Sequence, residues 1–339
     1  MEISTIGLDL AKSVFQVHGV DAQGRVVVQR RLKRGQVERF FAALPPALVG
    51  MEACSSAHHW ARMLGGLGHE VRLMPPAYVK PYVKRNKTDA RDAEAICEAV
   101  TRPTMRFVPV KSAETQAARG LHRVRDLLVR QRSQIGNCLR GLAAEFGLVA
   151  REGQAGLASL RERVAAAEGP IPEPLREVLA GLARQWAELD ASVAELDRRI
   201  AREAQAHETA RRLMAVPGVG PINAHALVAG VPDARAFRSG RDFAAWLGLT
   251  PRQASSGQRQ RSGPISRAGD RTLRRLLVLG AASLVRQSRA KPQARPWLTG
   301  LLGRRPVKVA IVAQAAKTAR IVWALMARGD TYRARPAAA

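Results

Sequence analysis

The spacing of hydrophobic residues changes along the chain, and the first 110 residues mix the periods of strands and helices. Short apolar runs between turn residues are typical of strands, whereas apolar positions three and four residues apart are typical of helices. The pattern predicts strands at residues 5–10, 14–20, 26–32, 47–51 and 70–74, and helices at 36–44, 58–67 and 88–100. Thr88 is a suitable N-cap for the last helix. This order predicts a mixed α/β domain.

Residues 112–206 are almost wholly helical in pattern, in two stretches separated by a Gly/Pro-rich segment at 169–174. The second stretch carries a heptad repeat formed by Leu175, Leu179, Leu182, Trp186, Leu189, Val193, Leu196 and Ile200. A weaker seam in the first stretch, interrupted by Gln131, is formed by Leu121, Val124, Leu128, Ile135, Cys138 and Leu142. Two interpretations fit: an antiparallel arm packed within one chain, or helices that pair with a second subunit.

The rest of the chain, residues 207–335, is predicted to be a compact helical region with basic loops. The sequence PGVGP at 217–221 lies between two apolar helical stretches and resembles a helix-hairpin-helix. In such a turn Gly218 and Gly220 let backbone N–H groups approach a phosphate, although an ordinary turn is the alternative. We expect three domains, an α/β domain at residues 1–110, a helical coiled-coil linker at 111–206 and a helical C-terminal domain at 207–335.

Charge indicates what the chain binds. It has 55 Lys and Arg against 28 Asp and Glu, a formal net charge of +27. This balance favours a polyanion such as DNA or RNA, because basic side chains displace counterions from phosphates. A genomic bias toward arginine is the alternative, but such a bias does not by itself remove acids. The residues predicted to contact nucleic acid are Lys12, Gly218, Gly220, Arg252, Arg259, Arg261, Arg267, Arg271, Arg274 and Arg275.

The three cysteines, Cys54, Cys97 and Cys138, are odd in number and lack CxxC spacing. Neither a disulfide framework nor a zinc site is therefore supported. The N-terminus lacks a signal-peptide pattern, and the longest apolar run, Leu276–Val285, is too short to span a bilayer. We expect a reduced, cytoplasmic protein that is associated with the nucleoid and has no membrane partner.

Four acidic residues stand where a metal site needs them in this otherwise basic chain. Asp9 and Glu52 come toward the ends of two predicted strands, and Asp89 and Asp92 share one face of a predicted helix. Clustered carboxylates repel one another unless a divalent cation lies between them, and Mg²⁺ prefers such oxygen ligands. If the two strands are neighbours, the four acids predict a site for one or two Mg²⁺ ions, or Mn²⁺ as a substitute, that assist phosphoryl transfer. Taken singly, each acid also fits a turn, cap or surface role.

The order strand-Asp9, strand-Glu52, helix-Asp89-x-x-Asp92 is similar to the RuvC-like branch of the RNase H fold. With it, the chain resembles the DEDD-type insertion-sequence transposases of the insertion sequence 110 family, which are bridge-RNA-guided serine recombinases. The resemblance covers essentially the whole chain. In the C-terminal half it is carried by residues 213–221, 243–251, 255–257 and 263–277.

The resemblance implies a nucleophile that the residue pattern alone does not reveal. The family uses a serine directly before a glycine, which here is Ser256, with Ser255 as the nearby competitor. Without the family, Ser256 reads as a serine in a flexible loop. The resemblance implies Mg²⁺-dependent DNA strand exchange through a phosphoserine intermediate, with donor and target DNA chosen by a noncoding bridge RNA. It also implies a homo-oligomer, a dimer or a dimer of dimers, with the RuvC-like domain of one subunit facing the serine domain of another.

Two other functions fit the residues. A RuvC-like or RNase H-like hydrolase would use the same acids with water as the nucleophile. A non-catalytic architectural protein would use only the basic surface to hold nucleic acid. Replacing Ser256 by alanine separates the recombinase from the hydrolase, because only the recombinase would lose covalent capture of DNA.

Overall fold

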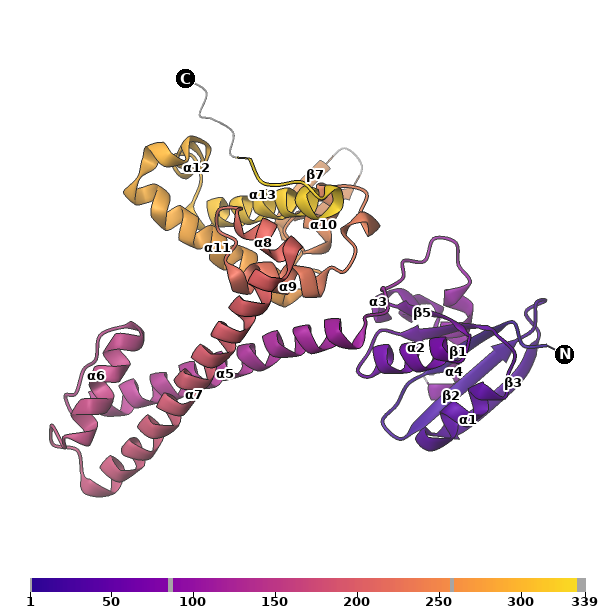
Figure 1. Ribbon diagram of the computed structural model, residues 1–339, viewed down its shortest axis with the longest axis horizontal. Coiled ribbons are helices and arrows are strands. Elements are labelled where there is room, and N and C mark those ends of the chain that lie inside the picture. The colour runs from indigo at the N-terminus through magenta and orange to yellow at the C-terminus, as the bar shows by residue number, and fades with distance from the viewer. Residues whose placement is uncertain (1, 85–87, 257–258, 334–339) are drawn as a thin grey trace. The chain divides into compact units, whose positions relative to one another are not determined.

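The computed structural model forms two compact units, Met1–Ala113 and Glu114–Ala339 (Figure 1). The second unit contains both the long helical arm and the C-terminal helical region, and the division into three domains stays a prediction. The structure describes residues 2–84, 88–256 and 259–333, and describes side chains in these ranges except at 254–262.

The first unit is built on a five-stranded mixed sheet of order β3-β2-β1-β4-β5. The central strand β1 pairs antiparallel with β2 and parallel with β4, while β3 and β5 form the edges. The strands are β1 (Thr5–Asp9), β2 (Val14–Val20), β3 (Val26–Lys33), β4 (Leu48–Glu52) and β5 (Glu70–Met74). The helices are η1 (Arg34–Gln36), α1 (Val37–Ala42), α2 (Ala57–Gly66), α3 (Pro76–Val79), η2 (Lys80–Tyr82) and α4 (Asp89–Val100). The mixed α/β prediction is confirmed, and the predicted strand and helix ends agree to within two residues.

One face of this sheet packs against α1 and α2. Side chains alternate between the two faces of a strand, so Ile6 and Leu8 of β1 point to this face together with Phe15 and Val17 of β2. They meet apolar residues of the two helices in a core that also contains Val37, Phe41, Ala57, Trp60, Ala61 and Leu64. Removal of this apolar area from water is the main force that holds the layer together.

Helix α4 covers the opposite face over β1, β2 and β4, and two glycines permit its close approach. A Cβ atom on Gly7 would lie 2.0 Å from the carbonyl oxygen of Ala93, and one on Gly50 would lie 2.7 Å from the Cβ of Val100. The side of α4 that faces the sheet is therefore small and buried, and the helix backbone lies directly against the strands. This packing fixes where the first turn of α4 stands relative to the end of β1.

The arm of the second unit is an antiparallel pair of long helices with a short helix packed beside them. Arg125 pairs with Asp197 and Arg132 with Asp190, so residues further along the first helix meet earlier residues of the second. The elements are α5 (Ala113–Ala144), α6 (Gly153–Ala165) and α7 (Glu173–Ala206). This arrangement agrees with an arm packed within one chain.

The predicted apolar seams of α7 and α5 differ in how far their residues are buried. On α7, Leu179, Trp186, Val193 and Ile200 are buried, as the heptad repeat predicts. On α5 the predicted seam is the packed face only in part, because Ile135 packs against the core of the arm, whereas Val124 is 49% exposed and Leu142 is 37% exposed. The helix instead turns small and apolar residues inward toward α6 and α7, namely Gly136, Leu139 and Ala143.

The C-terminal region is a helical bundle with its own core and one β-hairpin. The helices are α8 (Glu208–Met214), α9 (Pro221–Gly230), η3 (Ala234–Ala236), α10 (Gly240–Trp246), α11 (Arg271–Ala290), η4 (Pro292–Ala294), α12 (Pro296–Leu302) and α13 (Val307–Arg328). The hairpin consists of β6 (Pro251–Ser256) and β7 (Arg259–Ile265). The prediction of helices joined only by loops is wrong at this hairpin, which has the composition of a basic loop.

Helix α13 is long and apolar enough to cross a membrane by length and composition alone. This helix is longer than the apolar run Leu276–Val285 of α11, which the sequence analysis took as the longest. Its buried residues, however, belong to the core of the second unit, where Ala315, Ala319, Val322 and Leu325 pack with residues of α8 to α11. This packing is that of a core helix, and it is consistent with the expectation of no membrane partner.

A buried polar network joins α5, α7 and α9. His122 Nε2 lies 2.8 Å from His225 Nδ1, and His225 Nε2 lies 3.1 Å from a carboxylate oxygen of Glu203. Burial, together with the neighbouring His225, lowers the pKa of His122 to about 4, and burial also lowers the pKa of His225. Both imidazoles are therefore neutral at neutral pH.

We expect the second unit to lose stability as the pH falls from about 6.5 to about 4. In this window the unfolded chain binds a proton at His122 and the folded chain does not, so protons favour unfolding. The shift from 6.5 to about 4 corresponds to about 3 kcal/mol at most. Thermal unfolding of His122→Gln is expected to show a flatter pH dependence, with exposed His59→Gln as the control. An unchanged pH slope in His122→Gln would contradict the assignment.

Candidate metal and nucleic-acid site

Three carboxylates from β1 and α4 meet at the carboxyl end of β1. Asp9, Asp89 and Asp92 each place one oxygen within 4.8 Å of the others. Asp9 is the last residue of β1, and the other two lie in the first turn of α4. Thr88 caps this turn, because its hydroxyl accepts a hydrogen bond from the Arg91 N–H at 3.4 Å. The positive end of the helix dipole favours acidic residues at this position.

Glu52 stands beside this cluster without belonging to it. It is the last residue of β4, and the parallel pairing of Leu8 with Met51 places it level with Asp9 on the neighbouring strand. The structure thus brings the two strand acids to the same end of the sheet. Glu52 lies outside the set of carboxylates within 4.8 Å of one another, but its charge acts on Asp9.

The electrostatics of the site favour a cation. Burial and the charges of Asp92, Asp89 and Glu52 raise the pKa of Asp9 to about 6, while a hydrogen bond from the Leu10 backbone N–H works in the opposite direction. Three oxygen ligands converging at the edge of a sheet fit a hard divalent cation, which keeps its other positions for water and phosphate. Asp9, Asp89 and Asp92 would hold such an ion.

Cys54 is a neighbour of the site that the sequence did not single out. It follows β4 closely, and its thiol donates a hydrogen bond to the Ser55 carbonyl at 3.4 Å. Burial and the charges of Glu52 and Asp9 raise the pKa of this thiol. This direction favours the protonated thiol at Cys54.

The candidate nucleophile lies in the second unit. Ser255 and Ser256 end strand β6, where the backbone register pairs Ser255 with Gln260 and Ser256 with Arg259. The serine predicted to lie in a flexible loop is therefore at the end of a hairpin strand. Gly257 lies outside the described residues. The side chains of Ser255, Ser256, Arg259 and Arg261 also lie outside them, so their roles stay predictions.

The two glycines of the 217–221 turn have different surroundings. Gly218 has a φ of +84°, and a Cβ there would lie 2.9 Å from Leu284 Cδ1 of α11. A Cβ on Gly280 of α11 would lie 2.0 Å from the Gly218 carbonyl oxygen. Packing against α11 is thus sufficient to explain Gly218. Gly220 precedes α9 and has open space where a Cβ would be, so it is the glycine with room for a phosphate.

Two of the arginines predicted to bind nucleic acid have contacts within the protein. Arg274 donates hydrogen bonds to the backbone carbonyls of Leu247 and Ala268, which joins α11 to the loops around the hairpin. Arg275 forms an ion pair with Asp126 of α5. These contacts give both side chains structural roles.

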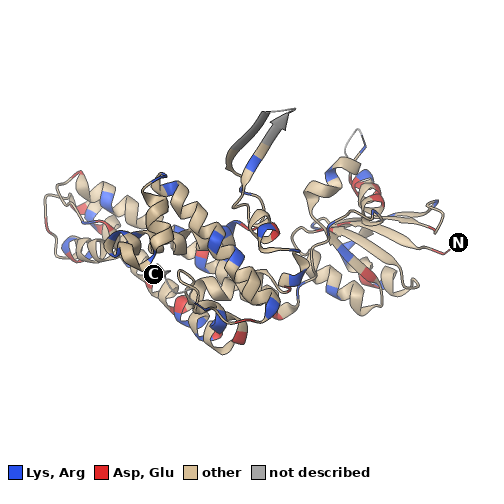
Figure 2. Cartoon of the chain, turned by 90° about the horizontal axis from the view of Figure 1, so that it is seen from above, with Lys and Arg blue, Asp and Glu red and all other residues tan. Residues whose placement is uncertain are grey.

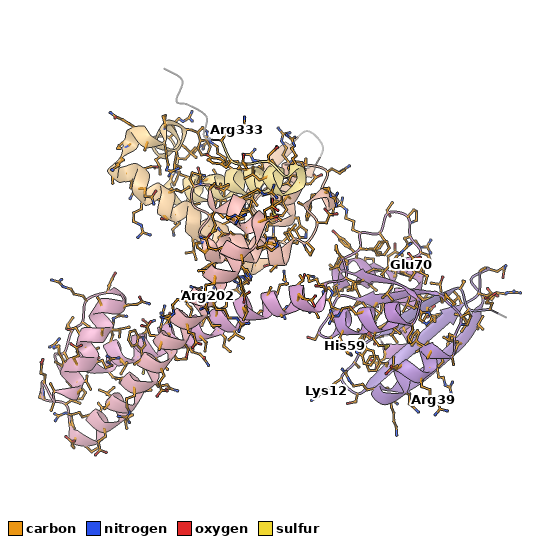
Figure 3. All side chains as sticks on the ribbon, viewed as in Figure 1. Lys12, Arg39, His59, Glu70, Arg202 and Arg333 are labelled. Atoms are coloured by element: carbon orange, nitrogen blue, oxygen red, sulfur yellow. The ribbon has the colours of Figure 1, made fainter. Side chains whose placement is uncertain are left out.

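Other predicted contact residues are exposed. Arg252 donates to the Ser266 carbonyl at 3.1 Å and is otherwise open to solvent, as is Arg271 at the start of α11. Arg267 adopts a left-handed backbone with a φ of +56°, which is uncommon for a residue with a side chain. Lys12 is exposed between β1 and β2 (Figure 3). Lys and Arg are spread along the helices of the second unit (Figure 2).

Comparison with protein families decides between the functional classes. Residues 6–146 match the DEDD transposase model of the IS110 type, and residues 210–296 match the model described as "Transposase IS116/IS110/IS902 family". The chain belongs to the IS110 family of transposases. The transposase is therefore an enzyme that cleaves and recombines DNA, and the architectural alternative is set aside. DEDD transposases use a divalent metal, which agrees with the acidic cluster.

Relatives match this transposase over almost their whole length. A Pseudomonas aeruginosa protein described as "Probable family 20 transposase" is 56% identical over 98% of this chain and 99% of its own. The transposase for insertion sequence element IS1111A of Coxiella burnetii is 39% identical over 98% of this chain and 92% of its own. That for IS1328 of Yersinia enterocolitica is 38% identical over 97% and 98%.

Proposed function

We propose that this transposase exchanges DNA strands through a covalent link to Ser256, with a divalent cation, Mg²⁺ in the cell, held at the acidic cluster. The observation that carries the proposal is the convergence of Asp9, Asp89 and Asp92 in a chain whose family is that of transposases. A bound cation would neutralise charge on the scissile phosphate. Glu52 adds its charge from the neighbouring strand to the effects of burial, Asp92 and Asp89 on Asp9.

The covalent step conserves the phosphodiester. The Ser256 oxygen forms a bond to phosphorus, one backbone P–O bond breaks, and the serine proton passes to the departing deoxyribose oxygen. Attack by the hydroxyl of another strand then reverses the process, so that the serine is regenerated and a new phosphodiester forms. Neither step needs an external energy source, because one ester replaces another.

The hairpin supports a role for arginine in this step. Its register sets Arg259 opposite Ser256, and Arg252 and Arg261 lie on the same two strands. Guanidinium groups near a serine nucleophile would stabilise the charge that develops on a pentacovalent phosphorus. A serine in a hairpin rich in arginine is therefore suited to phosphoryl transfer, although its hydroxyl is a weak nucleophile by itself.

The proposal also includes a bridge RNA that chooses donor and target DNA, and a homo-oligomer that supplies several strand sites. The net charge of +27 supports binding of nucleic acid, RNA as well as DNA. Two DNA partners each need two strands cut, which supports a dimer or a dimer of dimers. Co-purification of the element's RNA and the mass in solution test these two parts separately.

The deciding experiment follows labelled donor DNA on a denaturing gel, with full-length protein, the RNA flanking its gene and Mg²⁺. We expect a protein–DNA adduct that disappears in Ser256→Ala. The adduct should persist in Ser255→Ala, the matched control, which removes the hydroxyl group of the neighbouring serine. Cleavage without an adduct in the unaltered protein, with Ser256→Ala still active, would show a hydrolytic nuclease instead. Loss of the adduct only in Ser255→Ala would move the nucleophile by one residue.

A further inference from the structure

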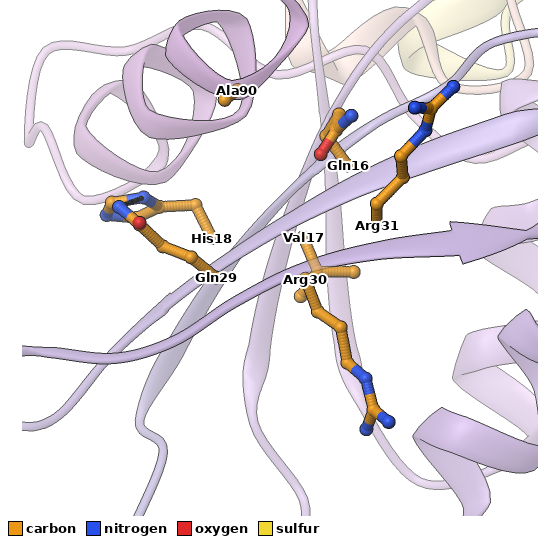
Figure 4. A pocket seen from close by; sticks show the side chains of 7 residues that line it. All are labelled: Gln16, Val17, His18, Gln29, Arg30, Arg31 and Ala90. Carbon is orange, nitrogen blue, oxygen red and sulfur yellow. Dashed lines mark hydrogen bonds between the residues drawn. The ribbon is translucent and has the colours of Figure 1, made fainter.

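A groove lies on the α4 side of the sheet, close to Asp9. Its volume is about 150 Å³, roughly that of five water molecules in the liquid. It is lined by residues of β2, β3 and the first turn of α4, namely Gln16, Val17, His18, Gln29, Arg31 and Ala90, and by Arg30, whose side chain points away from it (Figure 4). The groove has room for part of one nucleotide and is too small for a duplex.

The sheet register connects this groove to the acidic cluster. Asp9 pairs with Gln16 across β1 and β2, and Gln16 pairs with Arg31 across β2 and β3. Directly opposite residues of antiparallel strands project from the same face, so the three side chains form one row. With about 4.8 Å between neighbouring strands, Arg31 starts about 10 Å from Asp9. The row thus runs from the carboxylates to a guanidinium group.

A second row lies next to the first, and it is polar and uncharged. His18 pairs with Gln29 across β2 and β3, and the Gln29 amide donates to His18 Nδ1 at 3.4 Å. Burial lowers the pKa of His18, with Lys84 acting in the same direction and Glu94 against it. The imidazole is therefore neutral at neutral pH. His18 is buried, so it is the exposed Gln29 amide, together with Gln16, that offers hydrogen-bond donors and acceptors suited to a sugar or a base edge.

The position of α4 leaves the groove side of this face accessible. The helix lies over β1, β2 and β4 and comes closest at Gly7 and Gly50, whereas Gln29 and Arg31 on the edge strand β3 are exposed. A nucleic-acid strand whose phosphate reaches the carboxylates can therefore continue along β2 and β3. There it meets amide groups first and a positive charge at the far end of the row.

We propose that this groove binds the nucleotide next to the scissile phosphate of a single nucleic-acid strand. Gln16 and Gln29 hydrogen-bond to its sugar or base, and Arg31 neutralises the neighbouring phosphate. These are positioning residues, since they do not touch the reacting atoms. The inference rests on the proposed function, because it requires a strand to be cut at the acidic cluster. The ligand is the DNA strand that is cut, and RNA of the same sequence is the comparison in the test.

The test compares two adjacent arginines on β3. Arg31 lines the groove on one face, whereas the Arg30 side chain points the other way (Figure 4), with its guanidinium carbon 5.8 Å from the centre of the Phe40 ring. Single-stranded DNA and RNA of one sequence, each with a photoreactive base one nucleotide from the cleavage position, are cross-linked to full-length protein. We expect Arg31→Ala to lower cross-linking and affinity about tenfold, as for loss of one charge-assisted hydrogen bond, and Arg30→Ala to change them less than twofold.

The paired variant Gln16→Ala/Gln29→Ala is expected to lower cross-linking without changing the salt dependence of binding, because it removes no charge. Loss with DNA alone supports the assignment of the groove to the strand that is cut, whereas loss with RNA alone would contradict it, because a guide RNA carries no scissile phosphate. If Arg31→Ala and the paired variant behave like Arg30→Ala on both strands, the groove does not bind nucleic acid. Failure of the proposed function is distinguishable, because Ser256→Ala would then retain DNA cleavage, and Asp9→Asn would retain it only if the acidic cluster were not the place of cutting. Thermal unfolding confirms that each variant is folded.

Discussion

Replacement of Asp9 by asparagine is expected to lower the rate of Mg²⁺-dependent DNA cleavage about a thousandfold. The change removes one of the three carboxylates within 4.8 Å of one another, and with it the negative charge that holds a divalent cation. Loss of a group that stabilises the transition state directly typically costs two to three powers of ten in rate. Single-turnover cleavage of labelled donor DNA over a range of Mg²⁺ concentrations measures the loss.

The same variant is expected to be more stable than the unaltered protein when no metal is present. The pKa of Asp9 is raised from 3.8 to about 6, so folding favours the protonated form and the charged form destabilises the fold above pH 6. Asparagine resembles the protonated form at every pH. After allowance for solvent screening we expect a gain of about 1 kcal/mol at pH 7.5 and little change at pH 4. Added Mg²⁺ should stabilise only the unaltered protein.

Asp21→Asn is the control for this prediction. Asp21 lies in the same unit, where its carboxylate accepts hydrogen bonds from the backbone N–H groups of Gln23 and Arg25 at 3.0 and 2.9 Å. These bonds and the Arg25 guanidinium lower the pKa of Asp21, so its charge stabilises the turn between β2 and β3. Asp21→Asn should reduce stability and leave the cleavage rate unchanged. A normal Mg²⁺-dependent rate in Asp9→Asn would remove the acidic cluster from the mechanism.

The strands and helices of the first unit could be predicted from the sequence because the pattern of apolar residues matches the faces that are buried. Each strand of the sheet has one face turned to the core under α1 and α2, and the alternation of Ile6, Leu8, Phe15 and Val17 reflects that burial. Thr88 fulfils its predicted role because helices need a side-chain acceptor at the first turn. The acidic site requires β1 and β4 to be neighbours in the sheet. The sequence does not determine this pairing, and the strand order of the structure shows it.

Two features escaped prediction for different physical reasons. The hairpin β6–β7 is polar along its length, so it has no apolar period, and its pairing depends on backbone hydrogen bonds that composition does not report. On α5 the heptad positions are apolar, but the face that packs is chosen by its partner. The large side chain of Trp186 on α7 packs against α5 at Gly136, where there is no side chain. A Cβ atom added to Gly136 would lie 3.2 Å from the indole nitrogen of Trp186.

The sequence carries a further signal for the acidic site in the positions of two glycines. Each strand acid follows a glycine by two residues, Gly7 before Asp9 and Gly50 before Glu52. Residues two apart on a strand share a face, so each glycine marks the face to which its acid belongs. Because glycine has no side chain, a helix can lie close to the sheet on that face. The helix that lies there is α4, which carries Asp89 and Asp92.

Substitution of Gly7 by alanine is therefore expected to damage both the fold and the site. The added Cβ would lie 2.0 Å from the Ala93 carbonyl oxygen and 2.5 Å from the Cys97 nitrogen. Both are backbone atoms of α4 that cannot rotate away, so the helix must move off the sheet. Overpacking of this kind costs about 3 kcal/mol, which urea unfolding measures.

Movement of α4 also carries its first turn, with Asp89 and Asp92, away from Asp9. We expect Gly7→Ala to need more Mg²⁺ for half-maximal cleavage, and the pKa of Asp9 to fall because two like charges recede. Gly65→Ala is the matched control, since Gly65 lies within α2 and a Cβ there meets nothing within 4 Å. Alanine at that helical position should be neutral or stabilising by up to about 1 kcal/mol. Unchanged stability and unchanged Mg²⁺ dependence in Gly7→Ala would mean that the close approach of α4 does not position the carboxylates.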